Sequence, residues 1–419
     1  MSRFVIQGRQ QLEGEIEVKG MKNAITPILA STLLISGDCI LKNVPRILDV
    51  ETMIEILKSL GSRIEFLDEH TLKINNKDVN LQKLDKILIK KMRSSVLLIG
   101  PLLSRFGKVE IPEPGGCIIG NRPIDTHLNA LEKFGVKIEK EGEFYSLKTK
   151  GLVGNEIVLQ EFSVTATENA IMTAVLAKGK TVIKLAAAEP HVQDLCNFLN
   201  KAGAKISGIG THTLEIIGTK KLKGVEHTII PDQIETGTLA VIGALNQGKI
   251  LIKNIAPEHL DIILLKLKQI GVNFELKKNS LLVYHTAKLK AFNLQTLPYP
   301  GFPTDLQAPF GLLATQCQGT SLIKDPMYEG RLGYIQELVK MGANAIIADP
   351  HRVIITGPTP LYGQEIKTLD LRAGATLIIA GLIAYGETII NDAEIIDRGY
   401  EKIDERLAKL GAKIKRLED

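Results

Sequence analysis

Apolar residues recur at helical spacing in six segments of the chain, and each segment ends in the same short phrase. One such segment is the run from His191 to Lys201, whose apolar side chains fall on one helical face. The phrase has the form apolar–Gly–small–any–apolar, and alternating residues typical of a half-buried strand follow it. Glycine here supplies the left-handed backbone that ends many helices. The glycines are Gly61, Gly135, Gly203, Gly271, Gly342 and Gly411.

The spacing of these glycines indicates an internal repeat. Successive intervals are 74, 68, 68, 71 and 69 residues. A second glycine follows another apolar run and precedes a short strand, with intervals of 70, 72, 69, 71 and 67 residues. We therefore predict six repeats, each with a strand, a helix, a strand, a second helix and one or two further strands. The second glycines are Gly37, Gly107, Gly179, Gly248, Gly319 and Gly386.

Length and composition predict two domains of a soluble α/β protein. A chain of 419 residues exceeds what one hydrophobic core usually serves. The hydrophobic share of 44% and the charged share of 24% are ordinary for a globular protein. Three repeats in each domain place the division near residue 229.

Charge and hydropathy argue against several classes of function. A net charge of +5 is small for this length and suits anionic small molecules better than nucleic acid, which usually needs clustered Lys and Arg. The longest apolar stretch, residues 375–384, is too short to cross a bilayer. The first residues lack the apolar region and cleavage site of a signal peptide. Four cysteines in such a chain favour free thiols in a reducing compartment, so we expect a cytoplasmic protein without membrane insertion.

Polar residues occupy equivalent positions near the starts of the predicted helices. Counting back fourteen residues from each second glycine gives Asn23, Arg93, Thr165, Ile234, Asp305 and Arg372, at the start of the first helix of each repeat. Near the start of a second helix lie three more arginines, Arg122, Arg331 and Arg398. Unpaired N–H groups and partial positive charge make helix N-termini attractive to phosphate and carboxylate.

The chain contains few arginines, so their occurrence at these helix-start positions is informative. Only 13 of the 52 basic residues are Arg, and none lies between residues 123 and 330. Five of them occupy the helix-start positions, where a cation opposes the helix dipole. Arg also offers a bidentate fork for carboxylate and phosphate that Lys lacks. A surface ion pair explains any single Arg, but five in register favour an anion-binding site.

The second repeat carries an insertion rich in Pro and Gly, residues 112–125, which predicts a loop. It contains Cys117, five residues from Arg122. A nearby cation lowers the pKa of a thiol and favours the nucleophilic thiolate, so a reactive and a structural role stay equally open. No second Cys or His stands at ligand spacing, so we expect no metal. The other cysteines are interpreted as small core residues, Cys39 in a strand and Cys196 and Cys317 in helices.

Several candidates have equally simple structural explanations. Asn23 follows Lys22 at the start of the first helix and could be a cap. Asp305 could be a first-turn acid favoured by the helix dipole. Three histidines at helix starts could be caps or sugar contacts, and none has a visible triad partner; they are His127, His191 and His259.

Together these motifs resemble those of the UDP-N-acetylglucosamine 1-carboxyvinyltransferases, in the enolpyruvyl transferase family. The loop from Pro114 to His127 is similar to the family signature, and the resemblance spans the whole chain. The shikimate-pathway enolpyruvyl transferase shares the six-repeat architecture but lacks the cysteine loop. The other matching segments are Lys22-Asn23-Ala24, Arg93, Pro303-Thr304-Asp305, Glu329-Gly330-Arg331, Asp370-Leu371-Arg372 and residues 397–401.

The resemblance implies a fold, a domain division and a reaction. The fold would be an α/β fold, a two-domain inside-out α/β barrel of six repeated α/β units with three in each domain. Residues 22–228 would form the N-terminal domain and residues 1–21 with 229–419 the C-terminal domain, with the active site in the cleft between them. The enzyme would need no cofactor. It would transfer the enolpyruvyl group of phosphoenolpyruvate to the 3′-hydroxyl of UDP-N-acetylglucosamine and release phosphate, the first committed step of peptidoglycan synthesis. Cell-wall biogenesis, cell shape, the cell cycle and cell division would then depend on it.

The resemblance also implies roles for individual residues. The catalytic residues would be Lys22, Cys117 and Asp305, with Asp305 as the base and Cys117 as the acid, as an adduct-forming thiol and as the target of the antibiotic fosfomycin. Phosphoenolpyruvate would be bound by Lys22, Arg93, Arg122, Arg331, Arg372 and Arg398. UDP-N-acetylglucosamine would be bound by Asn23, Arg93, Arg122, Pro123, Ile124, Asp125, Thr126, His127, Ser163, Val164, Thr165, Asp305 and Met327.

Some positions depart from the family pattern, and other functions stay open. Thr165 stands where the family often has Gly, Glu161 where it often has a basic residue, and Ala188 and His191 where it has a basic and an acidic one. These changes affect nucleotide contacts rather than reacting groups. The alternatives are a shikimate-type transferase, a paralogue that binds without turnover, and a clamp around nucleic acid, which the Arg-free stretch disfavours.

Overall fold

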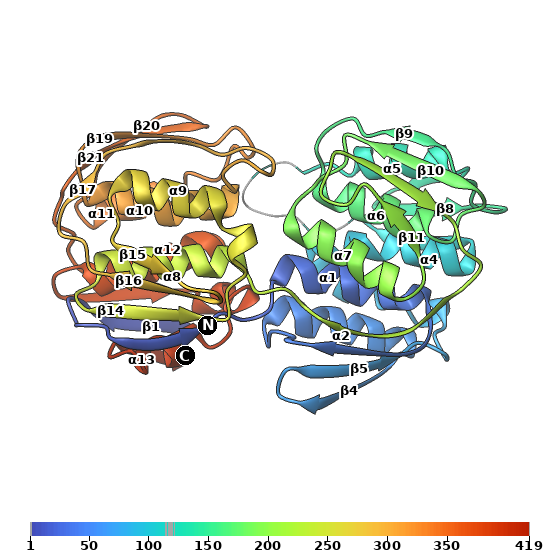
Figure 1. Cartoon of the computed structure of the whole chain (residues 1–419), viewed down its shortest axis with the longest axis horizontal. Helices are drawn as coiled ribbons and strands as arrows, with labels where there is room; N and C mark the ends of the chain where they lie inside the picture. Colours follow the sequence, from blue (N-terminus) through green and yellow to red (C-terminus); the bar gives the residue numbers. More distant parts are fainter. Residues whose placement is uncertain (1, 114, 116–119, 121, 419) are drawn as a thin grey trace. The chain divides into compact units, whose positions relative to one another are not determined.

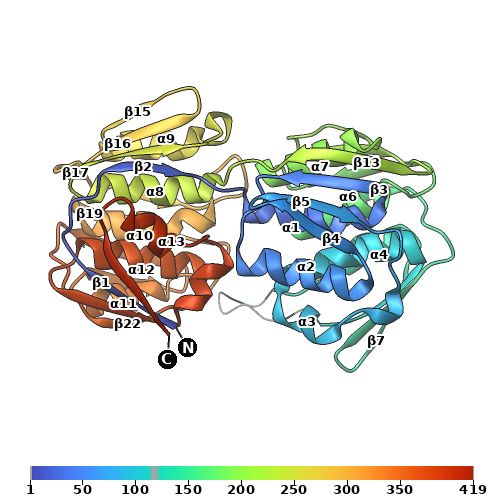
Figure 2. The same ribbon diagram turned by 90° about the horizontal axis from the view of Figure 1, so that it is seen from below.

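The computed structural model describes residues 2–113, 115, 120 and 122–418. The chain forms two compact units. Unit 1 contains Met1–Lys19 and Pro231–Asp419, and unit 2 contains Gly20–Cys117 and Asn121–Ile230. Figures 1 and 2 show both units from two directions.

Unit 2 contains the first three repeats. The first consists of α1 (Lys22–Ser31), η1 (Thr32–Leu34), β3 (Ile35–Lys42), α2 (Leu48–Leu60), β4 (Arg63–Asp68) and β5 (Thr71–Asn75). The second consists of η2 (Leu81–Lys83), α3 (Lys86–Lys91), η3 (Arg93–Leu98), α4 (Ile99–Phe106), β6 (Lys108–Pro112), α5 (Asp125–Lys133), β7 (Lys137–Glu141) and β8 (Phe144–Lys148). The third consists of β9 (Glu156–Val158), α6 (Val164–Ala174), β10 (Lys180–Lys184), α7 (Pro190–Lys201), β11 (Lys205–Ser207) and β12 (Thr213–Ile217), and β13 (Leu222–Thr228) follows it.

Unit 1 contains the other three repeats and the two N-terminal strands, β1 (Ser2–Gln7) and β2 (Gly14–Glu17). The fourth repeat consists of α8 (Gln233–Leu245), β14 (Lys249–Lys253), η4 (Pro257–His259), α9 (Asp261–Ile270), β15 (Phe274–Leu276) and β16 (Ser280–Tyr284). The fifth consists of β17 (Leu289–Lys290), β18 (Asn293–Gln295), η5 (Thr304–Leu306), α10 (Gln307–Thr315), β19 (Cys317–Lys324), α11 (Tyr334–Lys340), β20 (Asn344–Asp349) and β21 (Arg352–Gly357). The sixth consists of β22 (Glu365–Lys367), α12 (Leu371–Ile383), β23 (Glu387–Asn391), η6 (Ala393–Arg398), α13 (Ile403–Ala408) and β24 (Lys413–Glu418).

The predicted order of first helix, strand, second helix and further strand is present in all six copies, and a strand precedes the first helix in every copy except the second, where η2 and α3 occur instead. The recurring glycines explain the turns of the repeat. All twelve have positive φ angles, between +69° and +116°. Side chains rarely adopt this left-handed region, whereas glycine enters it without steric cost. One set ends the second helix of each repeat, and the other lies where the first helix gives way to a strand.

Each repeat contributes one small sheet, and the six sheets share one strand order. In five sheets the strand after the first helix pairs with one strand of the following hairpin, and in the sixth sheet β23 pairs with β1 in its place. In five sheets that strand also pairs with a parallel edge strand. The orders are β13-β3-β5-β4, β6-β8-β7, β9-β10-β12-β11, β2-β14-β16-β15, β17-β19-β21-β20 with β18 on β19, and β22-β23-β1-β24.

Three strands pair with repeats distant in sequence. β13 follows the third repeat but pairs in parallel with β3 of the first. β2 precedes the first repeat but pairs in parallel with β14 of the fourth, and β1 completes the sheet of the sixth. These pairings tie the N-terminal strands into unit 1 and close the set of sheets in each unit.

The first helices of the repeats form the interior of each unit, and the sheets lie outside them. α8 and α12 are buried along almost their whole length, and α10 packs against both. Figure 1 shows α8, α10 and α12 between the sheet of β14 and β16 and the sheet of β19 and β21. In unit 2, α4 packs against α6, and α1 is buried from Ala24 to Ser31. This is the inverse of a common α/β barrel, in which the helices lie outside.

The structure corrects one prediction and agrees with two others. Cys317 begins β19 rather than lying in a helix, because α10 ends at Thr315 and the chain leaves helical geometry at Gln316. Cys39 lies in β3 and Cys196 in α7, and all three of these cysteines are buried. Among the described residues, no helix has both the length and the apolarity to span a bilayer.

Candidate active site

The predicted register places polar side chains at the starts of the buried helices. Lys22 is the first residue of α1, Arg93 the first of η3, and Thr165 the second of α6. Asp305 lies in η5 before α10, and Arg372 is the second residue of α12. All therefore lie at one end of the internal helices of their own unit, as the sequence predicts.

In unit 1 the structure brings together Asp305, Arg331 and Arg372. The Nη2 atom of Arg331 donates a hydrogen bond to Oδ1 of Asp305 at 2.5 Å. The Nε atom of Arg372 donates to the other oxygen, Oδ2, at 3.2 Å. Both arginine side chains are more than nine-tenths buried. One carboxylate thus holds two guanidinium forks drawn from the fifth and sixth repeats.

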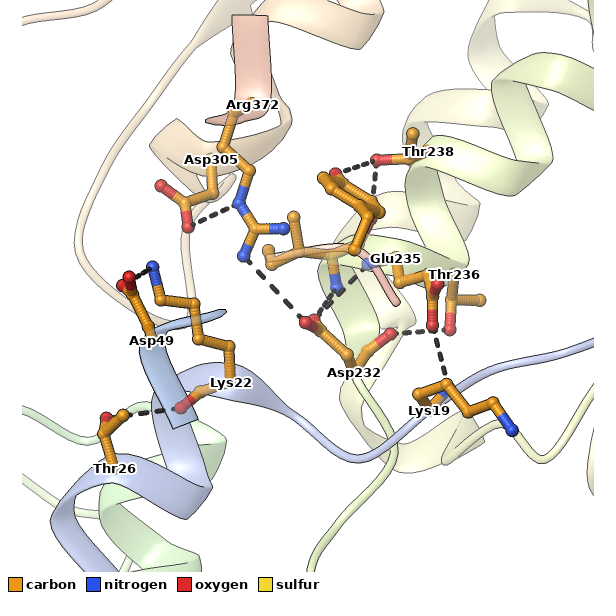
Figure 3. A network of polar contacts seen from close by, with 12 residues as sticks. Lys19, Lys22, Thr26, Asp49, Asp232, Glu235, Thr236, Thr238, Asp305 and Arg372 are labelled. Atoms are coloured by element: carbon orange, nitrogen blue, oxygen red, sulfur yellow. Dashed lines mark hydrogen bonds and ion pairs between the residues drawn. The ribbon is translucent and has the colours of Figure 1, made fainter. Parts of the chain in front are cut away.

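Arg372 also faces a second carboxylate. Its Nη2 lies 3.9 Å from Oδ2 of Asp232, and Figure 3 shows it pointing between Asp305 and Asp232. Its guanidinium carbon lies 5.3 Å from the centre of the Tyr400 ring. Burial raises the pKa of Asp232 to about 6, while the charge of Arg372 lowers it. Burial alone would lower the pKa of Arg372, but Tyr400, Asp305 and Asp232 raise it, so the guanidinium stays charged.

Two further carboxylates of this cluster, Asp232 and Asp370, had no role predicted from the sequence. Asp232 and Asp370 are the N-caps of α8 and α12, and each accepts hydrogen bonds from two backbone N–H groups. Both lie two residues before a register position, so the N-cap signature could have found them. Asp370 also lies 3.8 Å from Nη1 of Arg331.

Asp325 supports this cluster through hydrogen bonds, and its role was not predicted from the sequence. It is fully buried, and its Oδ2 accepts a hydrogen bond from the hydroxyl of Thr304, the neighbour of Asp305, at 2.6 Å. Its Oδ1 accepts from the hydroxyl of Thr296 at 2.8 Å and from the backbone N–H of Met327 at 3.0 Å. One carboxylate therefore fixes the turns that carry two predicted site residues. The remaining predicted site residue of unit 1, Arg398, is the last residue of η6 and is half-buried.

In unit 2, Lys22 forms an ion pair that the sequence did not reveal. Its Nζ lies 2.7 Å from Oδ2 of Asp49, which is buried in the first turn of α2 (Figure 3). Asn23 follows in α1, and Met21 rather than Asn23 is the cap residue. Arg93 donates from Nη2 to the backbone oxygens of Arg122 and, at 3.3 Å, Pro123. These contacts fix the backbone just before α5.

The N-termini of α5 and α6 carry most of the other predicted residues. Asp125, Thr126 and His127 are the first three residues of α5, and Ile124 precedes them. Ser163 caps α6 by accepting from the N–H of Ala166 at 3.4 Å, and Val164 begins that helix. The hydroxyl of Thr126 donates to Glu161 at 3.2 Å, so this acid holds α5 against the segment before α6.

Cys117 lies outside the described residues. The other cysteines are fully buried, and burial raises the pKa of Cys39, Cys196 and Cys317 to about 12. Their thiols therefore stay protonated near neutral pH and are poor nucleophiles. The guanidinium and ammonium groups described above suit phosphate and carboxylate, which form charge-assisted hydrogen bonds with them.

Six repeats with internal helices, outer sheets and cations at the helix starts define an enolpyruvyl transferase, and comparisons with known proteins agree. The model of the EPSP synthase (3-phosphoshikimate 1-carboxyvinyltransferase) family matches residues 6–407. The chain therefore belongs to the EPSP synthase family, and the predicted fold class is confirmed.

Relatives and solved structures refine this assignment. The chain is 45% identical over 415 residues to UDP-N-acetylglucosamine 1-carboxyvinyltransferase 1 of Caldanaerobacter subterraneus, covering 99% of both chains. It is 44% identical over 420 residues to UDP-N-acetylglucosamine 1-carboxyvinyltransferase of Koribacter versatilis, covering 100% of this chain and 97% of the relative. An enolpyruvyl transferase from Streptomyces tendae has the same fold with a TM-score of 0.91 at 24% identity, covering 99% and 98%. EPSP synthase of Acinetobacter baumannii gives 0.77 at 18% identity, covering 100% of both chains.

Proposed function

We propose that this protein is an enzyme that transfers the enolpyruvyl group of phosphoenolpyruvate to the 3′-hydroxyl of UDP-N-acetylglucosamine and releases inorganic phosphate. The full-length relatives named for this transfer support the proposal. The observation that carries it within the structure is the pairing of Asp305 with Arg331 and Arg372, a base candidate held by two groups that bind carboxylates. The product would enter peptidoglycan synthesis.

Cationic residues bind phosphoenolpyruvate in this proposal. Arg331 and Arg372 take its carboxylate, because each offers a planar fork that matches two oxygens. Lys22, Arg122 and Arg398 take its phosphate, and Arg93 adds positive charge. The ion pair with Asp49 holds the ammonium group of Lys22 in a fixed direction.

The sugar nucleotide is bound mainly by the starts of α1, α5 and α6. Asn23 and Asp305 contact the sugar, and Met327 also contacts the sugar nucleotide. Residues 122–127 and 163–165 contact the nucleotide. The N-termini of α5 and α6 supply partial positive charge for the diphosphate.

The chemistry is an addition followed by an elimination. Asp305 accepts the proton of the 3′-hydroxyl as that oxygen adds to C2 of the enol, and Cys117 delivers a proton to C3. The intermediate is a ketal that still carries phosphate. Loss of a proton from C3 and departure of inorganic phosphate restore the double bond, and the arginines stabilise the leaving charge. Cys117 can also add to C2 and form a covalent adduct.

A shikimate-type transfer is the alternative, because EPSP synthase shares the fold. It uses the same donor, so the residues for phosphoenolpyruvate do not distinguish the two reactions. The glycine-framed Cys117 favours the nucleotide sugar as acceptor. An enzyme of this pathway is expected to act in the cytoplasm, to serve cell-wall growth, cell shape and division, and to be inhibited by fosfomycin.

A measurement of phosphate release distinguishes these possible functions. The purified full chain is mixed with phosphoenolpyruvate and either UDP-N-acetylglucosamine or shikimate 3-phosphate, and inorganic phosphate is measured over time. We expect release with the nucleotide sugar and none above background with the shikimate ester. The reverse pattern would establish the shikimate-type reaction. Binding of UDP-N-acetylglucosamine without any release would identify a paralogue that has lost turnover.

A further inference from the structure

His127 connects α5 to two residues of α6 through both nitrogens of its ring. It is buried, with Nε2 3.0 Å from Oγ1 of Thr165 and Nδ1 3.0 Å from Nδ2 of Asn169. Thr165 and Asn169 lie four positions apart on α6 and therefore share a face of the helix. The three side chains form a continuous hydrogen-bonded path that ends at a residue in the first turn of α6.

The backbone fixes the orientation of Asn169. Its Oδ1 accepts a hydrogen bond from the N–H of Gly100 at 2.9 Å, and a backbone N–H can only donate. Its Nδ2 donates to the carbonyl oxygen of Val96 at 2.9 Å, and a carbonyl can only accept. The amide cannot be reversed without losing both bonds. The second Nδ2 proton therefore faces Nδ1 of His127, which must present a lone pair.

The direction of the next hydrogen bond follows from this tautomer. Burial, and then the charges of Arg93 and Arg122, lower the pKa of His127 to about 3, so the imidazole is neutral. With a lone pair on Nδ1, the ring proton resides on Nε2 and is donated to Oγ1 of Thr165. The hydroxyl of Thr165 accepts this bond, and its own proton points away from His127. Among the described residues, His127 is the only hydrogen-bond partner of the Thr165 hydroxyl.

We propose that His127 is a positioning residue that holds the hydroxyl of Thr165 as a hydrogen-bond donor to a phosphate oxygen of the nucleotide sugar. The inference rests on the proposed function and adds a contact specific to this chain, because a glycine at position 165 could not make it. Three features select phosphate: Thr165 is only half-buried, it lies in the first turn of α6, and Arg93 and Arg122 bring positive charge near His127. Phosphate oxygens only accept hydrogen bonds, which matches a hydroxyl fixed as donor.

Three variants at position 165 test the contact. Thr165→Val keeps the shape but loses the hydroxyl, Thr165→Ser keeps the hydroxyl, and Thr165→Gly gives the residue common in the family. Affinity is measured by calorimetry with UDP and, separately, with uridine. We expect Thr165→Val to weaken UDP binding about tenfold, which is typical of a hydrogen bond to a charged group, and to leave uridine binding unchanged. Thr165→Ser should bind UDP nearly as wild type does, and Thr165→Gly should resemble Thr165→Val.

Two measurements on His127 separate positioning from mere packing. In protein with ¹⁵N-labelled histidine, we expect the Nε2–H tautomer, with the Nε2 resonance shifting on UDP addition in wild type but not in Thr165→Val. His127→Gln offers an amide donor near Nε2 and should retain more UDP affinity than His127→Leu. In the double variant His127→Leu/Thr165→Val, the loss of UDP affinity should be smaller than the sum of the losses in the two single variants.

The outcomes distinguish this inference from the proposed function. Unchanged UDP affinity in a folded Thr165→Val protein, or an Nδ1–H tautomer, would overturn the role of His127. Equal weakening towards UDP and uridine would also overturn it, because the contact would then not involve phosphate. Each of these results leaves wild-type phosphate release untouched. Thermal unfolding of every variant verifies that it is folded. Because the tautomer is measured on the wild type, the inference stays testable even if a variant does not fold.

Discussion

The carboxylate of Asp305 accepts a hydrogen bond from Nη2 of Arg331 at 2.5 Å, and its second oxygen is held by Arg372. Two adjacent positive charges favour the ionised form of a carboxyl group and reduce its tendency to take a proton. A base held in this way gains basicity only when another anion draws the guanidinium groups away. The carboxylate of phosphoenolpyruvate is such an anion, so its binding would prepare Asp305 to act on the sugar hydroxyl.

Replacing Asp305 by Asn should abolish most turnover. Loss of a general base typically costs about 10²–10⁴ in rate, and phosphate release measures it. Because two buried guanidinium groups lose a partner, we also expect stability to fall by about 1–3 kcal/mol in urea unfolding. Asp349→Asn is the matched control, since Asp349 pairs with Arg352 at 2.6 Å on an exposed strand end. That change should cost little stability, because surface ion pairs contribute little, and no activity. Turnover retained in Asp305→Asn would remove Asp305 from the role of base.

Asp325 provides a test of how the Asp305 turn is held. Thr304 and Thr296 donate hydroxyl hydrogen bonds to opposite oxygens of this buried carboxylate, at 2.6 and 2.8 Å. Each Thr→Val change should destabilise the protein by about 1–2 kcal/mol. Only Thr304 adjoins Asp305, so Thr304→Val should also lower kcat several-fold, whereas Thr296→Val should leave kcat near the wild-type value. Equal kcat values in the two variants would show that Asp325 does not position the base.

Local sequence signals predicted the repeat because its causes are local. Glycine at positive φ and apolar residues at helical spacing depend on near neighbours, so the ends of the helices and the positions of Lys22, Arg93 and Arg372 could be predicted. The start of β19 could not, because Cys317 follows Leu313 at helical spacing and only pairing with distant strands marks the change from helix to strand.

The partners of the charged residues could not be predicted for the same reason. Lys22 with Asp49 and Arg372 with Asp232 are pairs that tertiary packing creates. The pairing of β13 with β3 likewise joins the third repeat to the first. Alternation of apolar and polar residues identifies a strand but does not specify its neighbour. Asp232 is an N-cap, however, and a search of the sequence for N-caps would have found it.

Glu168 should make stability depend on pH. It is fully buried in α6, and its Oε1 has no hydrogen-bond partner in the part of the chain that the structure describes. Burial, and then the charge of Glu189, raises its pKa well above the ordinary value. The unfolded chain therefore releases this proton more readily than the folded protein, and folding becomes less favourable as pH rises above about 4.3.

The variant Glu168→Gln removes this penalty. The free energy of unfolding of Glu168→Gln minus that of the wild type, both measured in urea, should increase as pH rises from about 4.5 to about 8. Glu132→Gln, on the exposed face of α5, is the control for losing a negative charge. A stability difference between Glu168→Gln and the wild type that stays constant over this range would show that Glu168 ionises normally in the folded protein.

Fosfomycin should label the protein once, at Cys117. Its epoxide reacts with thiolates, and the pKa values of about 12 keep the buried thiols of Cys39, Cys196 and Cys317 protonated. Intact-protein mass after exposure should rise by one adduct in the wild type and in Cys196→Ser, and stay unchanged in Cys117→Ser. Labelling of Cys117→Ser to the wild-type extent would place the reactive thiol elsewhere. Because burial excludes the other three thiols, a single adduct lost only with Cys117 would tie the reactive chemistry to the glycine-framed loop.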